Sequence, residues 1–391
     1  MARIMMTGMC SVQDRLAYHS DSRRVFYRPF FPAIRSYDQF INEFKIAANT
    51  GNYLITEGAY RAFEGHDVDY IPFWYLSQWI HLAEFREWLG NEYHFCLFAT
   101  ANILSADFDL ASEVEVLEGL PIPVIFMSIG VQRRSDLAGS LRPGAARFID
   151  FLKRPETHAF TRGAFAAAFL RSQGVKNVYE ACCPSAFNHS QQIVQGIKRL
   201  KEISVDSLGE VWFNGYLGEG PEAALREIKP FFPIAKRVGY VFQDEPLLFG
   251  AMSNMVGHPS VYDAGSGALT RTPASHLALF PSDSIDYYAF FSPETWRARA
   301  SAVDLLVGRR FHGNLVGLQA GRPALFISHD DRVNEMLTSV GLPHVHPVQW
   351  NEAPDRLKFF ESFVKTIDFA QFENGYNTKK ETFARQIRAI V

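Results

Sequence analysis

The stretch from Asp304 to Ile327 constrains the fold of this chain more than any other part of it. Leu305–Val307 is a short apolar run of the kind that forms buried strands, and the polar turn Gly308–His312 follows it directly. The next residues place apolar side chains on one face of a helix, which a glycine and a proline end before a second apolar run. Strand, helix and strand in this order and at this spacing predict a parallel α/β sheet.

The polar turn after the first of these strands is the strongest candidate site. Ligands of open α/β sheets bind beyond the carboxyl ends of the strands, which is where Arg309, Arg310 and His312 stand. The turn also opens a helix, whose first N–H groups are unpaired and attract anions. A surface arginine or a capping histidine would explain each residue singly, but the combination indicates a site for a small anion beside a proton donor or acceptor. Gly313 and Asn314 continue the turn and belong to the same predicted site.

Other polar turns and strand ends are candidates for substrate binding. Asn49, Gly51 and Asn52 form a turn that leads into a helix and can offer backbone N–H groups to an anion. Many such turns are only helix caps, so this reading stays open beside the functional one. Gly130 and Arg162 each follow a short apolar strand. We include all five residues in the predicted substrate site.

The whole chain repeats the alternation of strand and helix in both of its halves. With 391 residues it is too long for one typical core, and a polar, mixed segment at residues 188–207 separates the halves. We therefore predict an α/β protein with two doubly wound lobes, residues 1–200 and 201–391, that face each other across a central cleft. The last segments read as helices, and the C-terminal helix can pack back on the first lobe.

The composition excludes several classes of protein. The chain is 47% hydrophobic and 21% charged with a net charge of −3, which gives no electrostatic case for binding nucleic acid. It has four cysteines and no C-x-x-C pair, so we expect a reduced protein of the cytoplasm. No apolar run approaches the ~20 residues that cross a bilayer. We expect no transmembrane segment, while a peripheral contact with a membrane-bound substrate is compatible with this sequence.

Common cofactor and catalytic motifs are missing from the sequence. There is no G-x-G-x-x-G after a strand, no P-loop, no H-E-x-x-H and no G-x-S-x-G elbow. His329-Asp330-Asp331 and His344-Val345-His346 contain residue types that bind metals. Helix capping explains them better, with Asp330 or Asp331 at the start of the next helix. We expect neither a metal nor a cofactor.

The residues named so far resemble the polysaccharide pyruvyl transferase family. The closest match is the block Asp304–Gly313, where the family has an Arg, then an aromatic residue or Leu, then His-Gly. The weaker matches are the Gly-x-Pro of residues 321–323, the acidic helix start of residues 330–335, the turn at residues 49–52, the Thr-Arg-Gly of residues 161–163 and the segments 174–178 and 183–187. Together they span roughly residues 45 to 345. Many members differ by a Gly-Gly pair near residues 98–102 and an Arg-Asp pair at residues 162–163.

The resemblance implies a fold and an activity. It implies two Rossmann-like lobes in a GT-B-like arrangement, the first on the acceptor side and the second on the donor side. It implies a transferase that moves the pyruvyl unit of phosphoenolpyruvate onto a hydroxyl pair of a bacterial-type polysaccharide, or of its lipid-linked precursor, as a ketal. Phosphoenolpyruvate and a glycan acceptor are then the partners. By resemblance, Arg310 binds the anionic donor, His312 transfers a proton, and Arg162 completes the clamp from the other lobe.

Two other functions are compatible with the same residues. One is a GT-B glycosyltransferase that uses a nucleotide sugar, which predicts binding of a nucleoside diphosphate. The other is a non-catalytic member of the family that keeps the two lobes for binding or assembly. It predicts no release of phosphate with any acceptor.

Overall fold

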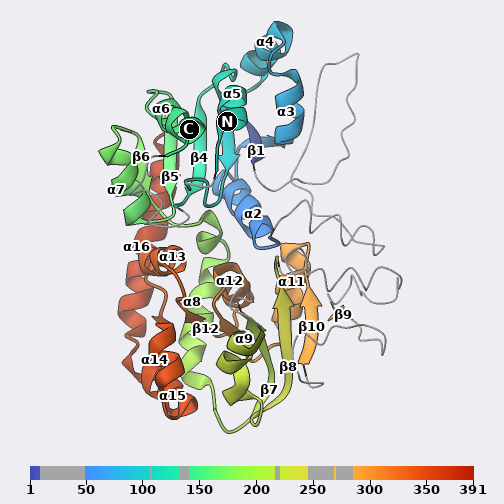
Figure 1. The fold of residues 1–391 in the computed structure, drawn as a ribbon, viewed down its shortest axis with the longest axis vertical. Coiled ribbons are helices and arrows are strands. Elements are labelled where there is room, and N and C mark those ends of the chain that lie inside the picture. The colour runs from blue at the N-terminus through green and yellow to red at the C-terminus, as the bar shows by residue number, and fades with distance from the viewer. Residues whose placement is uncertain (9–48, 106–107, 132–140, 216–220, 245–267, 270–284) are drawn as a thin grey trace.

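The computed structural model describes residues 1–8, 49–105, 108–131, 141–215, 221–244, 268–269 and 285–391. The chain is α/β and forms two Rossmann-like lobes, one above the other in Figure 1, each built on its own sheet. The predicted fold class is therefore confirmed. Among the described residues, no helix combines the length and the apolar character needed to cross a bilayer.

The first lobe is built on a parallel sheet with the strand order β2-β1-β3-β4-β5-β6. Its strands are β1 (Arg3–Gly8), β2 (Asp67–Tyr70), β3 (Phe95–Ala99), β4 (Val124–Ile129), β5 (Thr157–Thr161) and β6 (Val178–Glu180). Its helices are α2 (Asn52–Ala62), α3 (Phe73–Trp79), α4 (Ala83–Glu92), α5 (Ala111–Glu118), α6 (Pro143–Leu152) and α7 (Ala164–Ser172). Every residue of β4 is buried, as expected of a strand covered by helices on both faces.

The segment between the two sheets is helical. It contains the 3-10 helix η2 (Pro184–Phe187), helix α8 (Ser190–Lys198) and the 3-10 helix η3 (Arg199–Glu202). The sequence suggested a polar boundary at residues 188–207, but α8 is amphipathic and buries Ile193, Val194 and Ile197 in the second core. The polar residues of this segment lie on the outer face of the helix, which is why composition alone resembled a linker.

The second lobe is built on a sheet with the order β13-β12-β11-β7-β8-β10-β9, parallel except for β9. Its strands are β7 (Leu208–Asn214), β8 (Ala235–Phe242), β9 (Ala268–Leu269), β10 (Ile285–Ala289), β11 (Leu305–Gly308), β12 (Ala324–Ile327) and β13 (His344–Val345). Its helices are α9 (Pro221–Ile228), the 3-10 helix η5 (Lys229–Phe231), α11 (Pro293–Ala300), α12 (Phe311–Gln319), α13 (Asp331–Val340), α14 (Pro347–Glu352), α15 (Arg356–Thr366) and α16 (Phe369–Arg388).

Two helices belong to both hydrophobic cores. The first turns of α2 place Leu54 in the core of the second lobe, while Ala59 and Phe63 pack in the core of the first. The C-terminal helix α16 does the same, with Tyr376 in the second core and Phe383 in the first. Figure 1 shows α16 running alongside both lobes. Neither lobe is therefore an independent packing unit.

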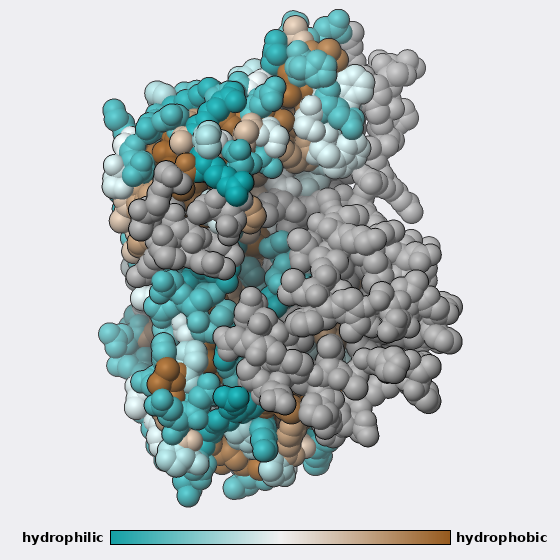
Figure 2. All heavy atoms as spheres, viewed as in Figure 1, coloured by the Kyte–Doolittle hydropathy of each residue, from teal (hydrophilic) through white to brown (hydrophobic). Residues whose placement is uncertain are grey.

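A helical segment of the first lobe is divided in the structure. Apolar residues recur at helical spacing from Leu76 to Leu89, but α3 ends at Trp79 and α4 begins at Ala83. The side chains of Trp79 and Leu82 at the break are 39% and 40% exposed. Apolar side chains gather at this tip of the molecule in Figure 2. The periodic pattern therefore did not mark one continuous buried face.

Candidate functional site

The two central strands of the second sheet end together at a topological switch point. The chain places β8 and β10 on one side of β7, then crosses to place β11 and β12 on the other. Asn214 ends β7 and Gly308 ends β11 beside it. A Cβ at Gly308 would lie 2.3 Å from the carbonyl oxygen of Asn214, so only glycine allows the strands to end this close. Switch points are where open α/β sheets bind ligands.

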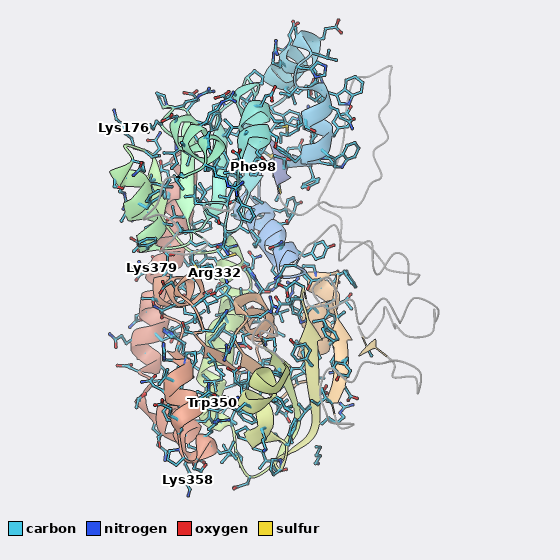
Figure 3. The ribbon with its side chains drawn as sticks, in the orientation of Figure 1. Phe98, Lys176, Arg332, Trp350, Lys358 and Lys379 are labelled. Atoms are coloured by element: carbon cyan, nitrogen blue, oxygen red, sulfur yellow. The ribbon has the colours of Figure 1, made fainter. Side chains whose placement is uncertain are left out.

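A cleft of about 240 Å³ lies beyond this strand end and between the lobes. Side chains from both lobes line it, and Figure 3 labels one of them, Arg332, where the lobes meet. Five predicted site residues line the cleft: Asn49, Asn52, Arg162, Arg310 and His312. The other lining residues are Ala101, Asn102, Gln243, Asp244, Phe311, His329, Arg332, Val333 and Met336.

Arg162 is the cation of the cleft that lacks a carboxylate partner within the described residues. It follows β5 and is 4% exposed. Its Nε donates to Ser128 Oγ at 2.8 Å and its Nη1 donates to Asn102 Oδ1 at 3.0 Å. Its Nη2 is buried and has no hydrogen-bond partner among the described residues. Burial lowers the pKa of this guanidinium group, so an anion that supplied the missing contact would be strongly stabilised.

The backbone around Arg162 is shaped to hold it. Ser128 has a φ of 75°, a left-handed conformation that non-glycine residues adopt at some energetic cost. A Cβ at Gly130 would lie 2.9 Å from Arg162 Cδ and 2.5 Å from Asn102 Oδ1. Gly130 does not line the cleft. It makes room for the arginine and its amide partner, and so serves the site without contacting a ligand.

Arg310 reaches the cleft from the opposite lobe but is already paired. Its Nη1 donates to Asp244 Oδ2 at 2.8 Å and its Nη2 contacts Asp244 Oδ1. Its Nε donates to the carbonyl oxygen of Gly215 at 3.1 Å. Asn49, from the first lobe, also donates to Asp244 Oδ2, at 3.3 Å. Asp244 therefore joins the lobes and neutralises the charge of Arg310.

Arg309 and Asn314 lie away from the cleft, contrary to their predicted role. Arg309 is 6% exposed and pairs with Glu227, which is fully buried. Asn314 accepts a hydrogen bond from Asn214 Nδ2 at 2.7 Å and donates to the carbonyl oxygens of Gly308 and Leu325. Alternate residues of the turn point to opposite sides, so one arginine faces the cleft and its neighbour faces the core. Asn314 joins β7, β11 and β12, and Arg309 ties the end of β11 to α9.

His312 lies on α12 and lines the cleft. Its Nε2 is 3.3 Å from the Sγ of Cys183. Burial, and to a smaller extent the positive charge of Arg162, lower the pKa of the His312 imidazole to about 3. The ring is therefore neutral at physiological pH and can act as a hydrogen-bond donor, an acceptor or a carrier of a proton.

The turn at residues 49–52 does not offer its backbone N–H groups to the cleft. The N–H of Gly51 donates to Asn49 Oδ1 at 2.8 Å, and those of Thr50 and Asn52 donate to backbone carbonyls. The expectation of a backbone anion site is therefore wrong here, and the turn contributes the side chains of Asn49 and Asn52 instead. Gly51 and Gly313 are close-packing positions, since a Cβ on either would lie within 3.0 Å of neighbouring side-chain atoms.

The two histidine segments weighed as metal ligands have other partners. Asp330 caps α13 by accepting from the N–H of Val333 at 2.8 Å, and it pairs with Arg332. His344 is hydrogen-bonded to Leu342 O and Asn334 Oδ1, and His346 caps α14. Within the described residues, no three His, Cys, Asp or Glu side chains come together as a metal site.

Several residues of the site escaped sequence analysis. Asn102 and Asp244 each follow a strand of their sheet, and Ser128 lies near the end of β4, so a polar residue at the end of an apolar run was an available signal. Cys183 gave no such signal. It lies 129 residues from His312 in the sequence, and only the packing of η2 against the second lobe brings the two together.

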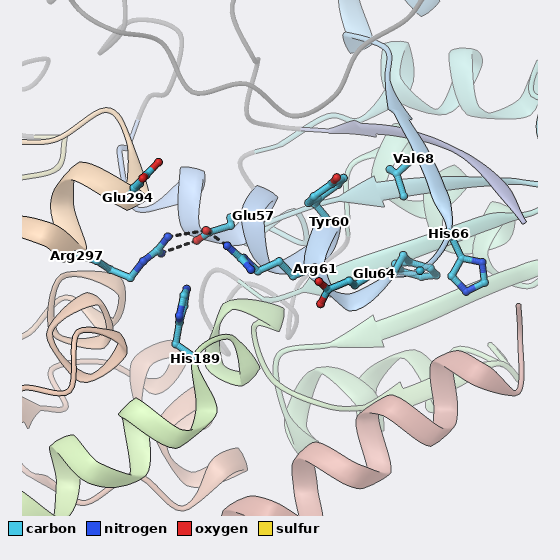
Figure 4. A pocket seen from close by; sticks show the side chains of 11 residues that line it. Glu57, Tyr60, Arg61, Glu64, His66, Val68, His189, Glu294 and Arg297 are labelled. Atoms are coloured by element: carbon cyan, nitrogen blue, oxygen red, sulfur yellow. Dashed lines mark hydrogen bonds and ion pairs between the residues drawn. The ribbon is translucent and has the colours of Figure 1, made fainter. Parts of the chain in front are cut away.

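A larger cavity of about 660 Å³ lies elsewhere, next to helices α2 and α11. Figure 4 shows Glu57 and Arg297 bridging the two lobes at its edge, with Arg61 on the other side of Glu57. None of the predicted site residues lines it. Both of its arginines, Arg61 and Arg297, pair with Glu57, in contrast with Arg162, so the smaller cleft is the stronger candidate.

Comparison with known proteins gives a family match over most of the chain. Residues 49–331 match the family model described as polysaccharide pyruvyl transferase. No curated protein matches the chain. Among solved structures it is similar to a glycosyltransferase from Rickettsia africae ESF-5, with 9% identity, 100% of this chain and 97% of the other covered, and a TM-score of 0.49. It is also similar to UDP-GlcNAc 2-epimerase from Neisseria meningitidis bound to UDP-GlcNAc, with 8% identity, both chains fully covered and a TM-score of 0.48.

Proposed function

Since this chain belongs to the polysaccharide pyruvyl transferase family, we propose that it moves the pyruvyl unit of phosphoenolpyruvate onto two hydroxyls of a glycan, forming a ketal. The acceptor in this proposal is a polysaccharide or its lipid-linked precursor, and the reaction needs no cofactor beyond the donor. One observation supports it above the others. Arg162 is buried in an interlobe cleft without an anionic partner among the described residues, which suits a donor that carries both a carboxylate and a phosphate.

The donor would lie between Arg162 and Arg310. The Nη2 of Arg162 can donate a hydrogen bond to the donor, because it has no partner among the described residues. The amides of Asn49, Asn52 and Asn102 line the same space. Arg310 would share its guanidinium group between Asp244 and the donor, or exchange one for the other. Arginines from both lobes on one trianion would then hold the lobes at a fixed separation during the reaction.

The chemistry needs proton transfer at the donor. The methylene carbon of phosphoenolpyruvate gains a proton. The oxygen of the first sugar hydroxyl bonds to the neighbouring carbon and releases its proton, which replaces the one consumed. The second oxygen then replaces phosphate, which leaves with its bonding electrons, while the second hydroxyl loses its proton to phosphate or to a base. We assign the proton transfer at the cleft to His312, which lines the same space as Arg162 and must itself take up a proton before it can give one to the methylene carbon. A bound anion would also raise the pKa of His312 by offsetting the charge of Arg162.

The direct test is mass spectrometry of candidate glycans incubated with the protein and phosphoenolpyruvate. The expected product has gained the mass of one pyruvyl ketal, with one phosphate released per product. His312→Gln keeps a polar side chain of similar size and should give no product. Full activity in His312→Gln would remove this residue from the mechanism. Thermal stabilisation by a nucleoside diphosphate but not by phosphoenolpyruvate would favour the nucleotide-sugar glycosyltransferase instead.

A further inference from the structure

The side chains of Ser185, Cys183 and His312 form a hydrogen-bonded series that runs from the interior of the protein to the cleft. Cys183 Sγ is 3.3 Å from His312 Nε2 and 3.0 Å from Ser185 Oγ. Cys183 and Ser185 are both fully buried. They stand at η2, which follows the first sheet, whereas His312 stands on α12 of the second lobe. The contact between thiol and imidazole therefore also joins the two halves of the chain.

The burial of Ser185 decides the direction of these hydrogen bonds. Within the described residues, the hydroxyl of Ser185 has Cys183 Sγ as its hydrogen-bond partner, so its hydrogen satisfies a bond only by pointing at the sulfur. The thiol hydrogen is then free to point at His312 Nε2, which accepts it as a neutral imidazole nitrogen does. The opposite direction would leave a fully buried hydroxyl hydrogen without an acceptor among these residues.

We propose that Cys183 is a positioning residue that holds His312 in the tautomer with its hydrogen on Nδ1. Nδ1 makes no hydrogen bond within the described residues, and His312 lines the cleft, so this N–H is the one that a ligand meets. The tautomer itself does not depend on the proposed function, but the role that follows for His312 rests on it, because that role assumes an anionic substrate in the cleft. With Nε2 occupied by a thiol, the neutral imidazole of His312 presents its Nδ1–H to the anionic substrate, so at this atom it acts as a hydrogen-bond donor and not as a base.

The neighbouring cysteine provides a matched control. Cys182 is equally buried, but its Sγ donates to the carbonyl oxygen of Met336 at 3.4 Å and does not contact His312. Truncating either cysteine to alanine removes one buried sulfur from the same interlobe region. Only truncation of Cys183 removes the group that faces Nε2.

The tautomer is measured directly by 15N NMR of the histidine side chains, with the His312 signals assigned by their loss in His312→Gln. In the wild-type protein the hydrogen should reside on Nδ1. Cys183→Ser keeps a donor at this position and should keep that tautomer. Cys183→Ala should give a mixture or a change to the Nε2–H form, while Cys182→Ala should leave the signals of His312 unchanged.

A wild-type Nε2–H tautomer, or an Nδ1–H tautomer that survives in a folded Cys183→Ala, would overturn the proposal. Because the NMR measurement needs neither donor nor acceptor, its result stands whether or not pyruvyl transfer is found. If transfer is found, kcat should fall about tenfold in Cys183→Ala and recover in Cys183→Ser, with KM little changed. Equal kcat in both variants would contradict the link between the tautomer and catalysis.

Discussion

Three arginines that look alike in the sequence have different electrostatic surroundings in the structure. Arg309 is neutralised by buried Glu227 and Arg310 by Asp244, whereas Arg162 has only neutral partners among the described residues, the hydroxyl of Ser128 and the amide of Asn102. An uncompensated buried cation is costly unless something anionic binds it. This difference, and not the number of arginines, is what supports the proposal that the cleft binds an anion.

The residue types of the site could be predicted from the sequence, but their partners could not. The turn with Arg310 and His312 was recognisable because it follows an apolar strand and opens a helix. Asp244 lies 66 residues from Arg310 and Cys183 lies 129 from His312, so no local pattern connects them. Arg309 was assigned to the site with its neighbour because sequence does not tell which of two adjacent side chains faces the core.

The depressed pKa of His312 predicts a pH dependence of folding stability. The unfolded chain takes up a proton near the ordinary pKa of 6.5, whereas the folded protein resists protonation until about pH 3. The unfolded state therefore binds more protons between these values, and the wild-type protein loses stability as the pH falls through this window. Urea denaturation at several pH values between about 7 and about 4 should show a steeper loss for the wild type than for His312→Gln. If the free energy of unfolding fell equally with pH in both proteins, burial would not be lowering the pKa of His312.

At the scale of elements, most strands and helices could be predicted from the spacing of apolar residues and from the glycine, proline and capping residues that bound them. The run Leu305–Val307 became the buried strand β11, and Asp330 capped α13 as its position suggested. The failures have a common cause. The break between α3 and α4 and the helical character of α8 depend on which face meets the rest of the protein, and this is decided by packing between distant segments.

The contact between α7 and α13 depends on one glycine, Gly163, which follows Arg162 in the chain. A Cβ at Gly163 would lie 2.2 Å from Glu335 Cγ and 2.6 Å from Ser339 Oγ. Ser339 donates to the carbonyl oxygen of Arg162 at 3.2 Å, and Glu335 accepts from the N–H of Ala166 at 3.0 Å. The carboxylate of Glu335 from the second lobe thus caps the start of α7 in the first.

Gly163→Ala should therefore destabilise the protein by about 1–3 kcal/mol, because the added methyl group forces α7 and α13 apart. The free energy of unfolding from urea titration measures this. Gly375→Ala is the matched control, since a Cβ at that position in α16 meets no atom within 4 Å. That change should stabilise the protein by about 0.5–1 kcal/mol through helix propensity. Equal effects of the two substitutions would show that the contact of α7 with α13 is not tight.

At the scale of the whole molecule, the two lobes share helices and a buried ion pair. Helices α2 and α16 contribute side chains to both cores. Glu57 on α2 accepts from both terminal nitrogens of Arg297 on α11, at 2.6 and 2.7 Å (Figure 4). The side chains are 8% and 12% exposed, so the pair is largely shielded from water. These contacts fix the width of the cleft that lies between the lobes.

Glu57→Gln should lower the free energy of unfolding by about 3 kcal/mol, because it leaves Arg297 buried without its countercharge. Glu373→Gln is the control, since Glu373 pairs with Lys198 in an exposed ion pair and its loss should cost at most about 1 kcal/mol. Denaturant titration of both variants provides the comparison. A loss at Glu57 no larger than at Glu373 would mean that the interlobe pair contributes little to holding the lobes together.

The central claim is that the cleft binds phosphoenolpyruvate through Arg162, whose Nη2 has no hydrogen-bond partner among the described residues. Calorimetric titration of the donor tests this claim most directly. Arg162→Gln should raise the Kd by about 10–100-fold, which corresponds to the loss of one or two charge-assisted hydrogen bonds. Arg332→Gln removes the same charge from the same cleft, but from an arginine paired with Asp330, and should weaken binding less. Phosphoenolpyruvate that binds a folded Arg162→Gln as tightly as the wild-type protein would contradict the account.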